Sequence, residues 1–219
     1  MRIFIYAPQS SGASVFCYWL SQLEGYLGII DLFVRFYPPP KEVLGNKNII
    51  LKAVVSELDL DKHIRRFQPD KKILFLRNPY QNYASLSSKK FKDFGGDIDS
   101  KFKKLDRIYE NRSLFDVMIK YEDFVSDKEG VVEALNEHGI PASLGNYDFH
   151  KSIEETVNFN CRHSEELART FRRQWDMGNI HNNYGQVCLC LKSTAIDELI
   201  KEKVDNLCPK LADFYSNKP

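Results

Sequence analysis

Four short runs of apolar residues stand out from the mixed sequence around them. They cover residues 3–6, 48–55, 73–76 and 117–119. Apolar positions in these runs follow one another instead of alternating with polar ones, which is typical of strands buried on both faces of a parallel sheet. The second run contains Lys52, although a lysine is rarely buried without a partner. The pattern predicts four inner strands.

Helical spacing fills the stretches between these strands. Apolar residues between 15 and 23 recur at helical intervals until Gly25 ends the pattern. Asn78 and Pro79 predict another helix start, since asparagine can cap it and proline suits its first position. Further helices are predicted over 99–112 and 195–207, and capping boxes predict helix starts at Ser126 with Glu129 and at Ser152 with Glu155. Alternating strands and helices in 219 residues predict one α/β domain with a parallel sheet.

The segment between residues 25 and 48 interrupts this alternation. It contains Pro38-Pro39-Pro40, which can continue neither a helix nor an inner strand. Two interpretations are open. The segment passes over the carboxyl edge of the sheet and helps to form a substrate pocket, or it is a surface connection without a function of its own.

Overall charge is nearly balanced at net +1, so composition does not favour bulk binding to nucleic acid or to a membrane surface. The predicted helix over 99–112 is locally basic, with Lys101, Lys103, Lys104 and Arg107 around its apolar side. This pattern predicts a solvated basic face, and binding of an anionic substrate is the alternative.

The five cysteines are odd in number and scattered, and Cys188-x-Cys190 does not have the spacing of zinc ligands. A reduced, cytoplasmic protein without a metal is the simplest interpretation. The first residues lead directly into a predicted strand, and no apolar run approaches membrane-spanning length.

Candidate chemistry begins in the loop of small residues after the first predicted strand, residues 7–14. A strand, a small-residue loop and a helix form a phosphate cradle, because backbone amides and a helix N-terminus face the anion. Gly12 permits close approach of the backbone, and Ser10, Ser11 and Ser14 offer hydroxyl donors. The loop is not a Walker A motif, since it contains no Gly-Lys-Ser/Thr.

A second candidate follows the strand over 73–76. Arg77 falls where a parallel sheet opens its ligand crevice, and Ser85 falls about two turns into the helix that begins after Asn78. Arginine supplies a planar, permanently charged fork, and serine supplies a directed donor. Together they can hold a phosphate group.

These motifs resemble those of the sulfotransferases that use 3′-phosphoadenosine 5′-phosphosulfate (PAPS). Arg77-Asn78-Pro79 followed by Ser85 resembles the family's 3′-phosphate-binding motif. Ser11-Gly12-Ala13-Ser14 matches part of its 5′-phosphosulfate loop. Tyr121, in Tyr-Glu-Asp-Phe, matches the tyrosine that packs beside the adenine.

The chain also departs from the family's pattern. Ser10 stands where the family's loop has a basic residue, and Val54 stands where many members have a histidine base. Lys52 matches a lysine that contacts the phosphosulfate, so it either supplies the missing charge or snorkels to the surface. Glu57 is a candidate base, although acidic residues after strands are commonly just solvated. Arg172 and Arg173 either match a basic loop that reaches the 3′-phosphate or are exposed helix residues.

The resemblance implies a single three-layer α/β domain over residues 1–219 with P-loop NTPase-like topology. Its nucleotide-binding core would cover about 1–125, and acceptor or lid helices about 126–219. It implies sulfuryl transfer from PAPS to a hydroxyl or amine of a small-molecule or glycan acceptor, without a metal, nucleic acid or membrane. Lys52 and Glu57 would be catalytic, and the nucleotide would be bound by Gln9, Ser10, Ser11, Gly12, Ala13, Ser14, Arg77, Ser85, Tyr121, Arg172 and Arg173. A catalytically impaired nucleotide-binding module and a P-loop small-molecule kinase are the alternatives.

Overall fold

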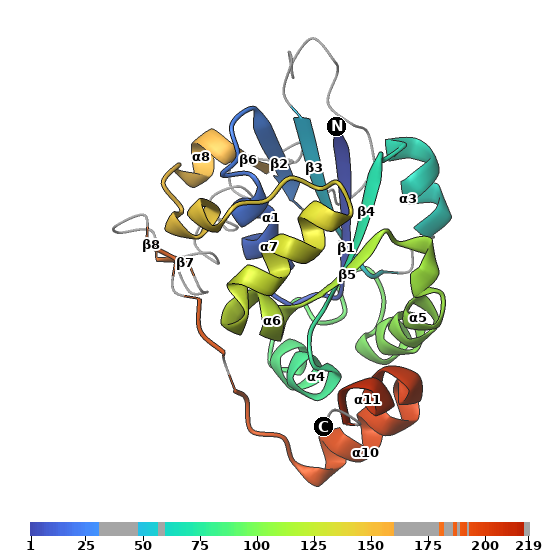
Figure 1. The fold of residues 1–219 in the computed structure, drawn as a ribbon. Helices are drawn as coiled ribbons and strands as arrows, with labels where there is room; N and C mark the ends of the chain where they lie inside the picture. The colour runs from blue at the N-terminus through green and yellow to red at the C-terminus, as the bar shows by residue number, and fades with distance from the viewer. Residues whose placement is uncertain are drawn as a thin grey trace.

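The computed structural model describes residues 1–30, 48–56, 60–159, 180–181, 186–187, 189–191 and 193–216. In these residues, six parallel strands form one sheet in the order β5-β4-β1-β3-β2-β6 (Figure 1). The strands are β1 (Arg2–Ala7), β2 (Tyr26–Ile30), β3 (Asn48–Val54), β4 (Lys71–Leu76), β5 (Val117–Lys120) and β6 (Val157–Phe159). Two short strands, β7 (Ile180–His181) and β8 (Gln186–Val187), form an antiparallel pair.

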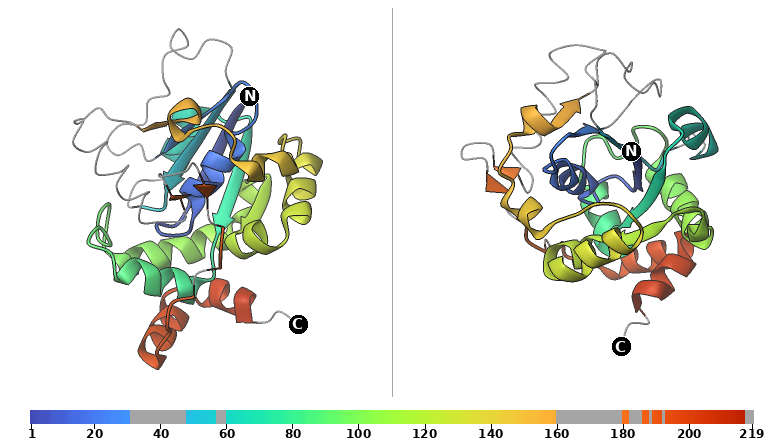
Figure 2. Two further views of the ribbon diagram at one scale, coloured as in Figure 1. Left: turned by 90° about the vertical axis from the view of Figure 1, so that its left-hand side faces the viewer. Right: turned by 45° about the horizontal axis from the view of Figure 1, so that its top comes forward.

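Helices cover both faces of the sheet, which gives three layers (Figures 1 and 2). One face packs against α1 (Ala13–Leu20), α6 (Tyr121–Ser126), α7 (Lys128–Glu137) and α8 (Ile153–Thr156). The other packs against α3 (Leu60–Phe67), α4 (Pro79–Ser87), α5 (Ile98–Glu110), α10 (Glu198–Leu207) and α11 (Pro209–Ser216). Two 3₁₀ helices cover Arg112–Leu114 and Leu144–Asp148. The predicted three-layer α/β domain with a parallel sheet is confirmed.

Strand β1 lies inside the sheet between β3 and β4. The chain proceeds from β1 to β2 and β3 on one side, then crosses to β4 and β5 on the other. The resulting order β2-β3-β1-β4-β5, extended by β6, is the expected P-loop NTPase-like topology. In open α/β sheets, ligands bind beyond the carboxyl ends of the strands where the winding reverses. The loop after β1 and Arg77 after β4 both emerge at this point.

Strands β2 and β6 are not among the four predicted strands, and residues 26–30 fall in the predicted connection. Gly28 interrupts the apolar run of β2, so the pattern is weak. A Cβ atom at Gly28 would lie 2.4 Å from Ser21 Oγ and 3.1 Å from Cys17 Sγ, both on or next to α1. The glycine therefore allows β2 and α1 to pack closely.

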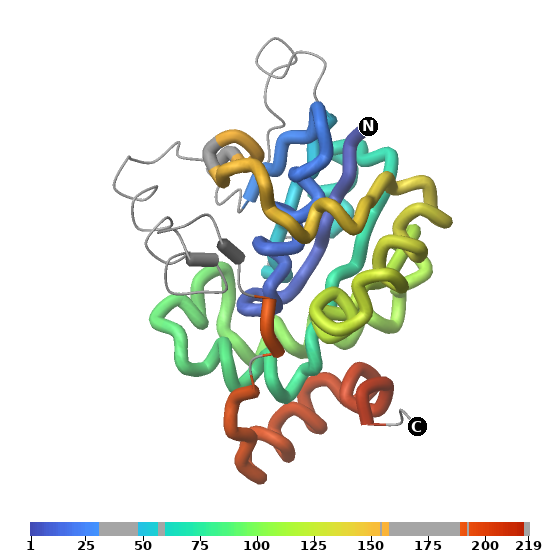
Figure 3. Tube along the Cα trace, turned by 60° about the vertical axis from the view of Figure 1, so that its left-hand side comes forward, coloured from blue at the N-terminus to red at the C-terminus, as the bar shows by residue number. Residues whose placement is uncertain are grey.

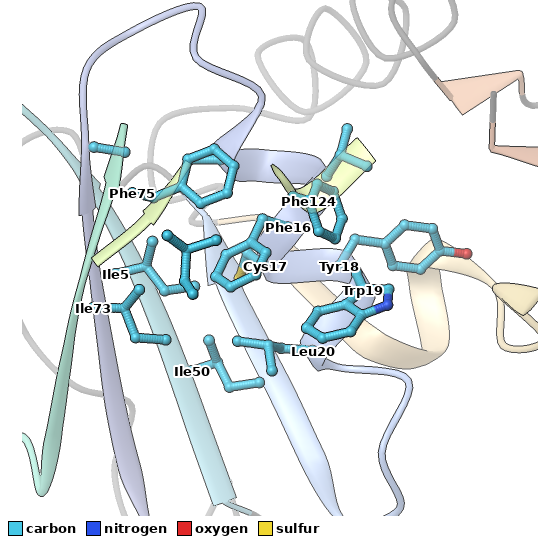
Figure 4. Packing of buried hydrophobic residues seen from close by; sticks show 14 of the residues in the cluster. Ile5, Phe16, Cys17, Tyr18, Trp19, Leu20, Ile50, Ile73, Phe75 and Phe124 are labelled. Carbon is cyan, nitrogen blue, oxygen red and sulfur yellow. The ribbon is translucent and has the colours of Figure 1, made fainter. Parts of the chain in front are cut away.

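Aromatic residues dominate the core between the sheet and α1 (Figure 4). Phe16 of α1 stacks on Phe75 of β4 with ring centroids 4.7 Å apart, and its edge contact with Phe124 of α6 measures 5.2 Å. Trp19 stacks on Phe16 at 5.5 Å. These rings bury large apolar areas and fix the angle of α1 on the sheet, which sets the position of the loop that precedes it.

The observed N-terminal caps of the helices agree with two of the three capping predictions. Asn78 caps α4, and its side chain accepts from the amides of residues 80 and 81. Ser152 and Glu155 form the expected capping box at α8. The predicted capping box at Ser126 is wrong, because Ser126 ends α6 and Asp127 caps α7.

At the C-terminus, α10 and α11 pack beneath α4 and α5 (Figure 3). None of the helices in the described ranges is long and apolar enough to cross a membrane.

Candidate functional site

The loop between β1 and α1 contains two residues with positive φ, Ser10 at 59° and Gly12 at 89°. Such left-handed residues turn neighbouring amides toward a common concavity. Ser11 between them is fully buried, and its Oγ forms no hydrogen bond within the described part of the chain. No described side chain caps α1, whose first turn contains Ala13 and the half-buried Ser14. A buried hydroxyl beside uncapped helix amides is suited to an anion.

Two buried side chains hold Gln9, the residue before this turn. Asn82 of α4 donates from Nδ2 to the Gln9 carbonyl oxygen at 2.7 Å, and Lys101 of α5 donates from Nζ to Gln9 Oε1 at 2.8 Å. Lys101 also donates to the carbonyl oxygens of Lys92 and Phe94, both at 2.7 Å. Asn82 is fully buried and Lys101 is 4% exposed. The loop is therefore fixed by the two helices that follow β4.

Sequence reasoning missed both of these residues. Lys101 was expected on a solvated basic face, which is wrong because α5 turns this position toward the loop. Its contact with Gln9 spans 92 positions, so nothing in the local sequence indicates it. Asn82 had a readable signal, since it lies four residues after the N-cap Asn78 and therefore on the same helix face.

Arg77 lies against the same loop. Its Nη1 donates to the Ser10 carbonyl oxygen at 3.0 Å, and its Cζ lies 5.0 Å from the centroid of the Tyr121 ring. Burial lowers the pKa of Arg77, while Tyr121 and Glu122 act in the opposite direction. Arginine nevertheless stays charged at neutral pH. The structure thus brings the motif arginine, the loop and Tyr121 together.

Tyr121 begins α6, directly after β5, and is 3% exposed. Its ring packs against Gly12, and its hydroxyl donates to the carbonyl oxygen of Cys190 at 2.8 Å. The amide of Asn78, just after Arg77, donates to Glu122 Oε1 at 2.9 Å. These contacts tie the ends of β4 and β5 to one another and to the loop after β1.

Lys52 and Ser85 are two further predicted site residues. Lys52 of β3 is 5% exposed and is in register with Ile5 and Ile30. Both partners belong to the core beneath α1, so Lys52 faces the side of the sheet that carries α1. Ser85 of α4 is half-buried and lies three residues after Asn82, on the same side of the helix.

Several predictions fall outside the described residues. They concern the candidate base Glu57, the basic pair Arg172 and Arg173, and the proline-containing segment over 31–47. Their proposed roles rest on the sequence alone.

The sequence matches no protein-family model and no curated protein. Among solved structures, mouse sulfotransferase SULT7A1 complexed with PAP is similar at 12% identity and a TM-score of 0.46, over 94% of this chain and 88% of that one. Retinol dehydratase in a complex with retinol and PAP is similar at 13% identity and a TM-score of 0.47, over 96% and 80%. The expected likeness to a sulfotransferase is thus found among solved structures. What those two proteins bind is a property of those proteins.

Proposed function

We propose that this chain transfers the sulfuryl group of PAPS to a hydroxyl or amine of an acceptor and releases adenosine 3′,5′-bisphosphate (PAP). The observation that carries the proposal is the buried Ser11 hydroxyl, which lacks a hydrogen-bond partner among the described residues. Leaving such a group unsatisfied costs about 1–3 kcal/mol. An anion in the loop provides the missing acceptor, and the adjoining Arg77 and Tyr121 favour a nucleotide as its carrier.

The loop fits the 5′ end of PAPS through neutral donors. Ser11, Ser14 and the first amides of α1 are proposed to bind the 5′-phosphate and the sulfuryl oxygens. Ser10 brings no charge where the resemblance expects one. Lys52 faces the side of the sheet that carries α1, and we assign it the compensating positive charge.

The other end of the nucleotide is assigned to Arg77, which follows β4, and to residues of α4 and α6. Arg77 and Ser85 are proposed to bind the 3′-phosphate, with the arginine also holding the loop through Ser10. Tyr121 is assigned to the adenine end, where its buried ring packs against Arg77 and Gly12 and holds both in place. Residues 1–125 would then form the nucleotide-binding core of the domain, and residues 126–219 would form its acceptor or lid part.

When bound, PAPS supplies an activated sulfuryl group for in-line displacement by the acceptor. The chain's own task is to position both reactants and to neutralise developing charge, as in phosphoryl transfer. The Lys52 ammonium is proposed to stabilise charge on the leaving phosphate. Glu57 is proposed to accept the proton that the attacking hydroxyl or amine loses.

A binding module without turnover is the second candidate. It is favoured by Ser10 in the loop and by Val54 at the family's histidine position. It predicts the same nucleotide affinity but no transfer. Formation of a sulfated product from labelled PAPS, in a screen of phenol, amine and glycan acceptors, separates the two candidates.

The decisive test is calorimetric titration with PAP, without magnesium, of the wild-type protein and Ser11→Ala. Because Ser11 Oγ has no described partner, its removal should leave the free energy of unfolding unchanged or raise it. The same substitution should weaken PAP binding about 10- to 150-fold, since a hydrogen bond to a charged group contributes about 1.5–3 kcal/mol.

Ser21→Ala is the matched control. Ser21 is equally buried, but its Oγ donates to the Cys17 carbonyl oxygen at 2.7 Å. This control should lose stability and keep its PAP affinity. Absence of PAP binding to the wild type, or equal binding by Ser11→Ala, would overturn the proposal. Binding of ATP in preference to PAP would favour the kinase alternative.

A further inference from the structure

A groove of about 570 Å³ runs along α5, on the side of the sheet opposite α1. We call it the α5 groove. Leu60, Ile108 and Leu114 provide its apolar lining, and Lys103, Lys104 and Arg107 provide its positive charge. Its volume lies in the range of small-molecule sites, about 300–1,000 Å³. An apolar wall with several cations suits a ligand that is apolar at one part and anionic at another.

The cations of the α5 groove lie close to one another on the helix. Lys103 and Arg107 are four residues apart, and Lys104 and Arg107 three apart, so like charges are neighbours on one helix face. Lys103 and Arg107 are exposed, and neither forms an ion pair with a carboxylate of the described residues. Lys104 is half-buried and donates to the Ser56 carbonyl oxygen at 2.6 Å. An anion bound between them relieves this repulsion.

The α5 groove also adjoins the loop to which the sulfuryl donor is assigned. Lys101 lines the groove and donates to Gln9 in that loop. Ser56, another lining residue, lies two positions after the end of β3, at the carboxyl edge of the sheet. The lining residues on α5 run from Ser100 to Ile108, about 12 Å at 1.5 Å per residue, and Asn111 and Leu114 continue the groove beyond the helix. A ligand in the groove can therefore extend from the loop along the helix.

We infer that the α5 groove binds the acceptor and that this acceptor is an amphipathic anion, with an apolar body and a carboxylate or sulfate group. That this ligand is the acceptor of a sulfuryl group rests on the proposed function. The choice of ligand class rests on the groove alone. The apolar body packs against Leu60, Ile108 and Leu114, and the anionic group lies near Lys103 and Arg107.

The test uses 2-naphthoate and its neutral, equally shaped counterpart 2-naphthamide as probes, titrated into the full chain by calorimetry. The wild type should bind the carboxylate more tightly than the amide. Lys103→Gln combined with Arg107→Gln should weaken naphthoate binding about 2- to 30-fold, since each exposed charge pair contributes about 0.2–1 kcal/mol. Naphthamide binding should not change. Lys201→Gln on α10 removes an exposed charge outside the groove and serves as the control.

Three results would overturn the inference. They are no naphthoate binding at millimolar concentration, equal binding of the two probes, and no effect of the double substitution. Naphthoate should also bind equally well with PAP saturating, because donor and acceptor occupy adjoining sites. Mutual exclusion would place the probe in the nucleotide site and overturn the acceptor assignment. PAP binding without naphthoate binding rejects only the groove, and the reverse result rejects only the proposed nucleotide site.

Discussion

The ring of Tyr121 occupies the space that a side chain at position 12 would need. A Cβ atom on Gly12 would lie 2.7 Å from two atoms of the ring. Gly12 also has a φ of 89°, a conformation that residues with a side chain rarely adopt. Two features therefore require glycine at position 12: the backbone conformation of the turn, and the ring of a residue more than 100 positions away in the sequence.

Gly12→Ala should therefore destabilise the protein more than the strain at φ alone explains. Gly25→Ala is the control, because Gly25 has a φ of 76° but nothing within 4 Å of the added Cβ. We expect Gly12→Ala to lower the free energy of unfolding by about 1–3 kcal/mol more than Gly25→Ala does, from overpacking against the ring. Urea denaturation of both variants measures the difference. Equal losses would show that the ring moves aside without cost.

Asn82→Leu should loosen the loop without changing the size of the buried side chain much. The Gln9 carbonyl loses its donor at 2.7 Å, which costs about 1–3 kcal/mol, and removal of Asn82 Oδ1, which has no hydrogen-bond partner among the described residues, offsets part of that cost. In Asn136→Leu, the two lost hydrogen bonds, to the carbonyl oxygen and from the amide of Ala142, lie in an exposed turn where water can replace them. Denaturant titration should show a larger loss in the free energy of unfolding for Asn82→Leu than for Asn136→Leu. PAP affinity should fall only in Asn82→Leu.

Lys101→Met tests whether the buried ammonium holds the loop. The substitution keeps the apolar stem but removes the donor to Gln9, Lys92 and Phe94. Leaving these acceptors unsatisfied should lower the free energy of unfolding by about 2–4 kcal/mol. Lys201→Met, at an exposed site of α10, should change it by less than about 0.5 kcal/mol. Similar stability of the two variants would contradict the assigned role.

The cysteines should differ sharply in reactivity. Burial raises the pKa of Cys208 to about 12, and its Sγ donates to the Val204 carbonyl oxygen. The thiolate is the reactive form, so iodoacetamide at pH 8 should modify the exposed Cys190 and spare Cys208 and the buried Cys17 in the native protein. Peptide mass spectrometry reads out the sites. Modification of Cys208 as fast as Cys190 would show that α10 opens readily.

The same pKa shift predicts lower stability in alkali. The unfolded chain releases the Cys208 proton near the ordinary thiol pKa of about 9, whereas the native state retains it up to about 12. The contribution of this thiol to stability is therefore complete below pH 9 and is lost as the pH rises between these values. Cys208→Ala should show a flatter decline in the free energy of unfolding over this range.

Local sequence signals predicted four of the six strands of the parallel sheet and most helix starts correctly. Uninterrupted apolar runs gave β1, β3, β4 and β5, and Asn78 with Pro79 gave the start of α4. The local sequence patterns gave wrong predictions at two places, in β2 and at the start of α7. Close packing of α1 requires glycine at position 28, and this glycine interrupts the apolar pattern of β2. At the start of α7, Asp127 is the N-cap instead of the predicted Ser126.

For the candidate site too, some features follow from the sequence and others only from the tertiary structure. The sequence by itself determined that a small-residue loop, an arginine and a tyrosine each follow a buried strand, because those positions depend only on residue type and order. Only the tertiary structure decided that Arg77 bonds Ser10, that Tyr121 packs on Gly12 and that Lys101 reaches Gln9. These contacts join segments separated by 67 positions or more. They arise from strand order and helix packing, which bring distant segments together.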